Sequence, residues 1–114
     1  MLTLKELQRL LSGELLTPET NTDMDCSEIF ASDLMSDVLA FMHPGSILVT
    51  GQVNTHVIRT ACLADVAAIV FIQGKRPDDA VMEEARLHSL PIISTSCSMF
   101  EACSRISRFI PDGG

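Results

Sequence analysis

Three short apolar runs, separated by helical patterns, constrain the fold of this chain more than any other feature of its sequence. The runs are SILVTG at residues 46–51, VAAIVFIQG at 66–74 and LPIISTS at 90–96. None alternates polar with apolar residues, which is typical of strands buried on both faces of a parallel sheet. Parallel strands need right-handed crossovers, here helical. We therefore predict an α/β fold, a three-layer Rossmann-like domain with a mainly parallel sheet flanked by helices.

The N-terminal quarter carries a weaker pattern. A leucine stripe predicts a first helix over residues 2–11, with Thr3 as its N-cap and Gly13 at its end. A short strand, ELLT at residues 14–17, and a polar loop, ETNTDMD at residues 19–25, should follow.

A second helix is predicted from Asp33 to about Met42, after an extended piece at residues 28–31. Ser32 is its expected cap, and His43-Pro44-Gly45 should end it. The apolar positions expected on its inner side are Leu34, Val38, Phe41 and Met42.

The remaining helices have clear start signals. Asn54 is a good N-cap, and Pro77 with Asp78 and Asp79 suits a first turn. Ser98 and Glu101 have the spacing of a capping box. In the helix after Asn54 we expect Val57, Ile58, Ala61 and Cys62 to face the sheet and His56, Arg59 and Thr60 to face away.

Length and charge limit the class of protein. A chain of 114 residues is expected to form one domain over residues 1–114, with a frayed tail at about 110–114. Its net charge of −7 and scarcity of aromatic residues argue against nucleic-acid binding. No apolar run is long enough for a membrane span, and the N-terminus does not read as a signal peptide. We expect a cytoplasmic protein.

Metal-ligand spacings are missing from the sequence. The four cysteines form no C-x-x-C pair, and the three histidines show no ligand spacing; they are Cys26, Cys62, Cys97, Cys103, His43, His56 and His88. We predict no metal site and no obligatory disulfide.

The strongest candidate site is the carboxyl edge of the predicted sheet, where loops meet helix N-termini in parallel folds. Its hydroxyls, amides, helix N–H groups and one lysine would suit a small anion or a nucleotide phosphate. Turn and capping needs explain the same residues about equally well. The candidate ligand-binding residues are Thr50, Gly51, Gln52, Asn54, His56, Gly74, Lys75, Ser94, Thr95, Ser96 and Ser98.

Other side chains offer weaker alternatives. Cys97 at a helix start could be a reactive thiol, although no adjacent base is evident in the sequence. Asp33 and Asp37, four apart, could hold a divalent cation, but an exposed helix face explains them more simply. Arg59, with His56 near it on the same helix, could contact a ligand or a partner. We assign no catalytic residue.

Phosphate-loop and hydrolase motifs are also missing. Nothing matches G-x-x-x-x-G-K-[ST], G-x-G-x-x-G or G-x-S-x-G. A self-contained kinase is therefore not expected.

Three segments in order, ASDLMSDVLAF, GSILVTGQVNTHVIRTACLADVAAIVFIQGKRPDDAVMEEA and LPIISTSCSMFEACSRI, resemble the DRTGG domain family. The resemblance runs from about Leu2 to Phe109 and is most specific at Gly74–Asp78 and at ISTSCSMFE. It is nearest to stand-alone members similar to the N-terminal domain of HPr kinase/phosphatase. That enzyme's kinase activity belongs to a separate P-loop domain.

The resemblance implies a Rossmann-like fold, a homodimer and a regulatory or ligand-sensing role. Some stand-alone relatives are encoded near iron-only hydrogenase and NADH-linked electron-transfer subunits. Our leading hypothesis is a non-catalytic regulatory module that binds a nucleotide or phosphorylated metabolite, with no other cofactor. The alternatives are a docking module for a redox or hydrogenase complex and a small enzyme that uses Asp33/Asp37 or Cys97.

Overall fold

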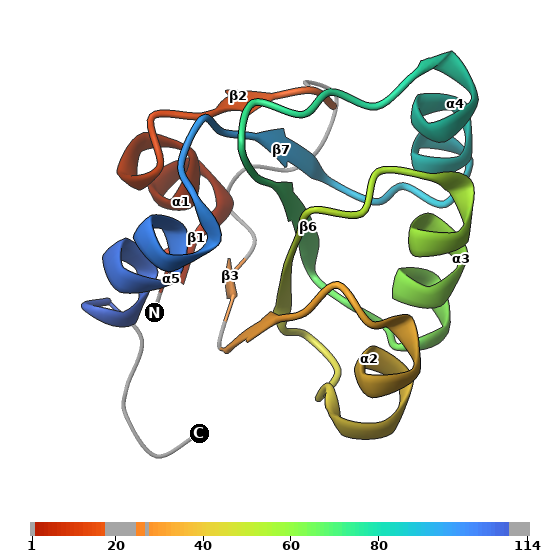
Figure 1. The fold of residues 1–114 in the computed structure, drawn as a ribbon, viewed down its shortest axis with the longest axis horizontal. Helices are drawn as coiled ribbons and strands as arrows, with labels where there is room; N and C mark the ends of the chain where they lie inside the picture. The colour runs from red at the N-terminus through yellow and green to blue at the C-terminus, as the bar shows by residue number, and fades with distance from the viewer. Residues whose placement is uncertain (1, 18–24, 27, 110–114) are drawn as a thin grey trace.

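The computed structural model describes residues 2–17, 25–26 and 28–109 of the chain (Figure 1). The predicted polar loop therefore lies outside the described residues except at Asp25, and the predicted tail lies outside them entirely. Among the described helices, none has both the length and the apolar character that a membrane crossing requires.

Within the described residues, the main sheet has five strands in the order β2-β7-β6-β5-β4. Strands β4 to β7 are mutually parallel, and β2 pairs antiparallel with β7 at one edge. A second, two-stranded sheet pairs β1 with β3. The strands are β1 (Leu2–Thr3), β2 (Glu14–Leu15), β3 (Asp25–Cys26), β4 (Ile29–Ala31), β5 (Ile47–Thr50), β6 (Ala68–Phe71) and β7 (Ile92–Ser94).

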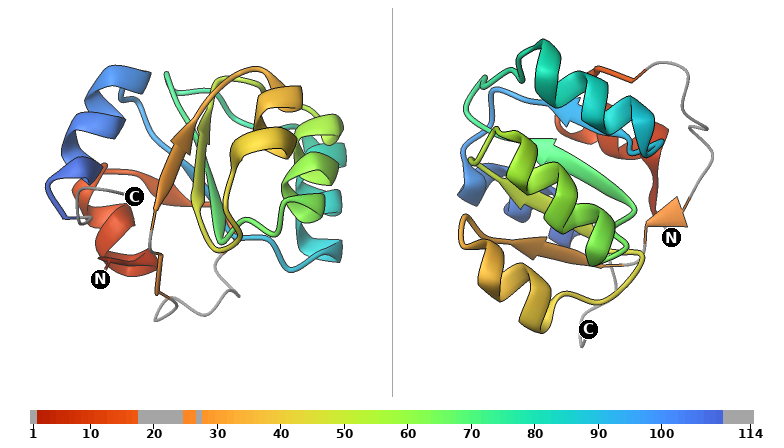
Figure 2. Two further views of the ribbon diagram at one scale, coloured as in Figure 1. Left: turned by 90° about the horizontal axis from the view of Figure 1, so that it is seen from below. Right: turned by 90° about the vertical axis from the view of Figure 1, so that its right-hand side faces the viewer.

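Helices cover both faces of the sheet, as Figure 2 shows in its left panel. Helices α1 and α5 pack on one face around Ile47, Val49 and Val70, while α2, α3 and α4 pack on the other around Leu48 and Ile69. The helices are α1 (Leu4–Leu10), α2 (Met35–Phe41), α3 (Thr55–Leu63), α4 (Asp79–Leu87) and α5 (Met99–Ser107). The predicted α/β fold with three layers is confirmed.

The three apolar runs form the centre of this sheet. Every residue of β5, β6 and β7 is buried, because each strand is covered on both faces. The last strand also anchors the N-terminal part of the chain. β7 pairs with β2, and the hydroxyl of Thr95 donates a hydrogen bond of 2.7 Å to the carbonyl of Leu11 at the end of α1.

Most of the predicted helix starts are confirmed. Thr3 caps α1, and Asn54 caps α3 by accepting from the N–H of Val57 at 3.0 Å. Ser98 and Glu101 form the predicted capping box of α5. One start differs, because Asp78 rather than Pro77 opens α4: its carboxylate accepts from Val81 N–H, and Pro77 precedes the cap.

The prediction for α2 was wrong at both its start and its inner face. The helix begins at Met35, because the hydroxyl of Ser32 accepts from Leu34 N–H in a turn before it. Met35, Val38 and Met42 are buried, whereas Leu34 and Phe41 are 57% and 67% exposed. Leu34 is the N-cap and lies before the helix, and the buried positions 35, 38 and 42 form a stripe that leaves Phe41 on the exposed flank.

Thr60 is also buried, at 2% exposure, where the sequence predicts an outward position. Helix α3 contacts both α2 and α4 and is the middle helix of its layer. Neighbours on two sides therefore bury its flanks as well as the stripe that faces the sheet.

Candidate functional site

The carboxyl ends of the parallel strands lie level with one another. Thr50 of β5 is opposite Phe71 of β6, and Phe71 is opposite Ser94 of β7. The loops that follow these strands therefore leave the sheet at one edge, which we call the carboxyl edge. The predicted corners of the candidate site are brought together there.

Asp33 joins the loop after β4 to the loop after β5. Its Oδ1 accepts a hydrogen bond of 2.7 Å from the backbone N–H of Gly51 and one of 3.1 Å from the hydroxyl of Thr50. A carboxylate that accepts two donors in this way forms charge-assisted bonds. The predicted pairing of Asp33 with Asp37 on one helix face is wrong, because Asp33 precedes α2 and its carboxylate lies against the neighbouring loop.

Lys75 closes the same corner from the loop after β6. Its Nζ donates a hydrogen bond of 2.9 Å to the carbonyl of Gly51. A Cβ atom on Gly51 would lie 3.3 Å from Lys75 Nζ and 3.4 Å from Asp33 Oδ1. A glycine at position 51 therefore leaves room for both an ammonium group and a carboxylate beside the turn.

The loops after β6 and β7 are tied together as well. The backbone N–H groups of Gln73 and Gly74 donate to the carbonyls of Cys97 and Thr95, both at 2.8 Å. The hydroxyl of Ser94 donates to the carbonyl of Lys75 at 2.9 Å. Gln73 and Gly74 have positive φ angles of 58° and 69°, so the corner turns sharply. Hydrogen bonds thus connect all four loops of the carboxyl edge.

The predicted ligand-binding residues fall into three groups by their exposure to solvent. Thr50, Ser94 and Thr95 are buried, and their hydroxyls are engaged within the protein. Gly51 and Ser98 are half-buried. The predicted residues that are exposed to solvent, which a ligand could reach directly, are Gln52, Asn54, His56, Gly74, Lys75 and Ser96.

Arg59 of α3 lies next to Glu84 of α4. Its Nη2 lies 3.7 Å from Glu84 Oε1, and the second oxygen of Glu84 lies 3.5 Å from His88 Nε2. Arg59 thus faces a neighbouring helix, although 64% of its side chain is exposed.

The thiols are placed as packing groups. Cys97 is 4% exposed, and its Sγ lies 3.8 Å from the carbonyl of Leu11. Burial raises the pKa of the Cys103 thiol, and burial together with the charge of Glu84 raises the pKa of the Cys62 thiol. A raised pKa disfavours the nucleophilic thiolate at Cys62 and Cys103. Among the described residues, no group of three or more His, Cys, Asp or Glu is placed to hold a metal ion.

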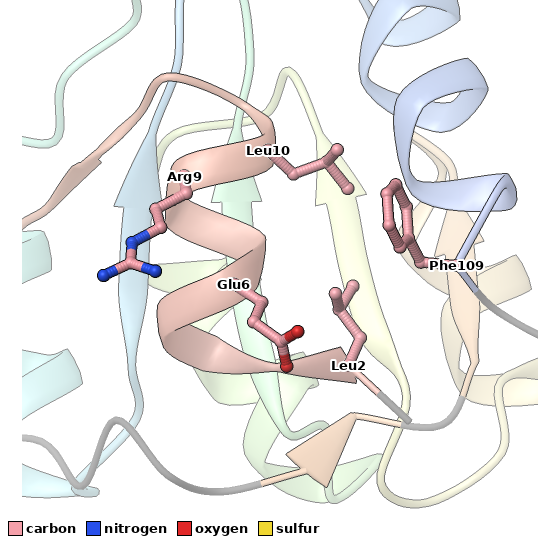
Figure 3. A pocket seen from close by; sticks show the side chains of 5 residues that line it. All are labelled: Leu2, Glu6, Arg9, Leu10 and Phe109. Atoms are coloured by element: carbon pink, nitrogen blue, oxygen red, sulfur yellow. The ribbon is translucent and has the colours of Figure 1, made fainter.

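Two cavities lie away from the carboxyl edge. One, of about 340 Å³, lies between α1 and the end of α5, where Leu2, Leu10 and Phe109 point toward one another (Figure 3). Another, of about 260 Å³, lies at the amino ends of β6 and β7 and includes Cys62 and His88. Neither cavity could be predicted from the sequence, because the residues that line it come from separate segments of the chain.

A third cavity, of about 360 Å³, lies between β2 and α4, and we call it the β2–α4 groove. Arg76 lies at this groove and forms two hydrogen bonds of 3.0 Å to the two carboxylate oxygens of Glu14. The guanidinium of Arg76 lowers the pKa of the Glu14 carboxyl, and the carboxylate raises the pKa of Arg76. Sequence reasoning missed this pair, whose partners lie 62 residues apart.

Comparisons with known proteins agree with this architecture. The family model described as DRTGG domain matches residues 6–109. Among curated proteins, no sequence matches this chain. A solved structure of the CBS and DRTGG domains from the regulatory region of Clostridium perfringens pyrophosphatase, complexed with its activator diadenosine tetraphosphate, matches with a TM-score of 0.77 at 18% identity. The match covers 96% of this chain and 47% of that one, so the chain spans about half its length.

Proposed function

The chain belongs to the DRTGG domain family, and on this premise we propose that it is a regulatory module that senses a nucleotide or another small phosphorylated molecule at the carboxyl edge of its sheet. The DRTGG-containing regulatory region of the Clostridium perfringens pyrophosphatase was captured with a nucleotide activator, which supports a ligand of that class. The ligand and the place where it binds here are our inference.

The observation that carries the proposal is the linkage of the four loops at one edge. Asp33, Gly51 and Lys75 lie on successive loops, Ser94 ends β7, and hydrogen bonds join them in series. A molecule that contacts one loop therefore acts on its neighbours. The exposed ammonium of Lys75 supplies a positive charge for phosphate, and His56 supplies a further polar group at the start of α3.

The test is a thermal-shift titration with diadenosine tetraphosphate, ATP, AMP and inorganic phosphate. A ligand at a hundred times its Kd adds about 2.7 kcal/mol of stability, which corresponds to a Tm rise of about 10 °C for a domain of this size. We expect at least one nucleotide to produce a saturable rise. If none of the four compounds changes Tm, the sensing proposal fails.

Two variants locate the response. Lys75→Met and His56→Ala should each reduce the Tm rise that the stabilising nucleotide produces. Arg108→Ala is the control and should leave that rise unchanged, because it removes one positive charge at the end of α5, on the opposite face of the sheet from α3 and α4. Equal losses in all three variants would indicate a non-specific charge effect and would contradict a site at the carboxyl edge.

We also propose that the module works as a homodimer that forms along β4. Within the described residues, β4 pairs on one side only, with β5. Leu34 and Phe41 are exposed on the adjacent α2, and exposed apolar side chains of this size are common at protein interfaces. The monomer has a mass of 12.4 kDa. Sedimentation at micromolar concentration should give twice that mass, and Phe41→Glu should return the monomer.

The second candidate is a docking module for another enzyme, and the same exposed side chains favour it. A redox or hydrogenase complex is the partner that the sequence resemblance implies, and it stays a prediction. Co-purification of a stable enzyme partner at native expression, with no thermal response to nucleotides, would favour docking over sensing.

A further inference from the structure

The β2–α4 groove combines an apolar wall with positive charge. Its described lining includes the half-buried side chains of Leu15 and Leu16 on one side and of Pro77 and Met82 on the other. Arg76 and Arg86 contribute guanidinium groups to the same lining. The chain has eight basic residues against fifteen acidic ones, and two of the basic residues lie at this one cavity together with Glu14.

The geometry of Arg76 indicates which group this groove can hold. Two of its nitrogens face two oxygens of one carboxylate, each at 3.0 Å. This parallel arrangement is the one by which arginine recognises carboxylates and phosphates. The Glu14 carboxylate therefore stands where the acid group of a ligand would bind.

The pair between Glu14 and Arg76 is exchangeable. Their side chains are 61% and 57% exposed, and ion pairs in such positions contribute little to stability because water solvates both partners. An incoming anion therefore loses little affinity by displacing Glu14. The Asp33 carboxylate at the carboxyl edge differs, since it accepts from a buried hydroxyl and a backbone N–H.

We propose that the β2–α4 groove is a second ligand site, distinct from the carboxyl edge, for a small molecule that joins a phosphate or carboxylate to an apolar body. The acid group pairs with Arg76 in place of Glu14, and the apolar body packs on Leu16 and Met82. The cavity of about 360 Å³ is at the small end of the range of known ligand pockets, which fits a compact molecule.

The proposal is tested by NMR titration with phenyl phosphate, a compact molecule with both required parts. Methyl-labelled leucine and methionine report on the wall, and the Nε–H of Arg76 reports on the charge. We expect saturable shifts at Leu16, Met82 and Arg76 with a Kd of about 1 mM, given the few atoms of the probe. Inorganic phosphate should bind at least about fivefold more weakly, because it lacks the apolar body.

Variants separate the proposed contacts from general charge attraction. Arg76→Met should weaken phenyl phosphate binding about tenfold, since a bidentate charged contact is lost. Glu14→Gln should strengthen it about threefold by removing the competitor. Arg108→Met, which removes one charge at the end of α5, should leave the Kd unchanged.

Three results would overturn the proposal. One is an equal loss of affinity for phenyl phosphate in Arg76→Met and Arg108→Met. Another is equal affinity for phenyl phosphate and inorganic phosphate. The third is a shift pattern at Gln52 and His56 without shifts at Met82, which would assign the probe to the carboxyl edge and support the proposed function instead.

Discussion

Lys75 and Arg76 are adjacent in sequence, but they lie in two different regions and bind different kinds of partner. Lys75 lies in the carboxyl edge and donates to the carbonyl of Gly51, within hydrogen bonds that join four loops. Arg76 lies in the β2–α4 groove and pairs with Glu14, one exposed side chain with another. A charge fixed to the backbone of a neighbouring loop stabilises the fold, whereas a charge paired at the surface is available for exchange.

The largest effect should come from breaking the strand that carries Glu14. A Cβ at Gly13 would lie 2.8 Å from Ile93 Cγ2 and 3.0 Å from the carbonyl oxygen of Ser94. The backbone oxygen cannot move aside without disturbing β7, so Gly13→Ala should cost about 1–3 kcal/mol in the free energy of unfolding. Urea denaturation measures this loss in the free energy of unfolding. An unchanged midpoint would mean that β2 and β7 separate freely.

The next effect tests the carboxyl edge. Asp33→Ala removes the acceptor for Thr50 and Gly51 and should cost about 1–2 kcal/mol. Asp37→Ala is the matched control: Asp37 lies in the first turn of α2, where a negative charge adds only about 0.5 kcal/mol. Equal losses in the two variants, measured by urea denaturation, would refute the structural role given to Asp33.

A smaller effect separates the two adjacent basic residues directly. Lys75→Met removes the donor to Gly51 and should cost about 0.5–1 kcal/mol. Arg76→Met should lower the thermal midpoint less than Lys75→Met does, because water solvates both partners of its ion pair. If Arg76→Met proves the more destabilising of the two, the groove pair is structural and the contrast between the regions is lost.

The smallest effect concerns pH. The pKa of Glu14 is lowered from its ordinary value of 4.5, chiefly by hydrogen bonds from Arg76. A carboxyl with a depressed pKa contributes stability above its unfolded value, and that contribution is lost as the pH falls through the folded pKa. Glu14→Gln should therefore lower the stability by a small constant amount above about pH 4.5 and flatten the stability–pH curve below it. Arg76→Met should flatten the curve in the same pH range, because it removes the hydrogen bonds that lower the pKa of Glu14, and an unaltered curve in that variant would contradict this cause.

Local features of the fold could be predicted from the sequence. Asn54 and the Ser98–Glu101 pair were identified as helix caps because the capping side chain and the backbone N–H that donates to it lie three residues apart. The burial of β5, β6 and β7 followed from apolar runs of strand length. In each case the physical cause is contained in a short segment.

The contacts that define the two regions could not be predicted in this way. Asp33 meets Gly51 because β4 and β5 are neighbours, and Lys75 meets Gly51 because β5 and β6 are neighbours. Strand order is not encoded in any short segment. The sequence therefore suggested that Asp33 pairs with Asp37, four residues away, although its hydrogen-bond partners are Thr50 and Gly51 at the end of the neighbouring strand.

The anchoring of the N-terminus to β7 has a consequence for the order of events during synthesis. β2 pairs with β7, and Leu11 receives its hydrogen bond from Thr95, 84 residues later. The segments that form α1 and β2 therefore leave the ribosome before β7, and their native contacts there cannot yet form. Contacts this distant slow folding. A chain stalled before residue 90 would expose the apolar stripe of α1, and a chaperone that binds nascent chains should retain it until β7 emerges.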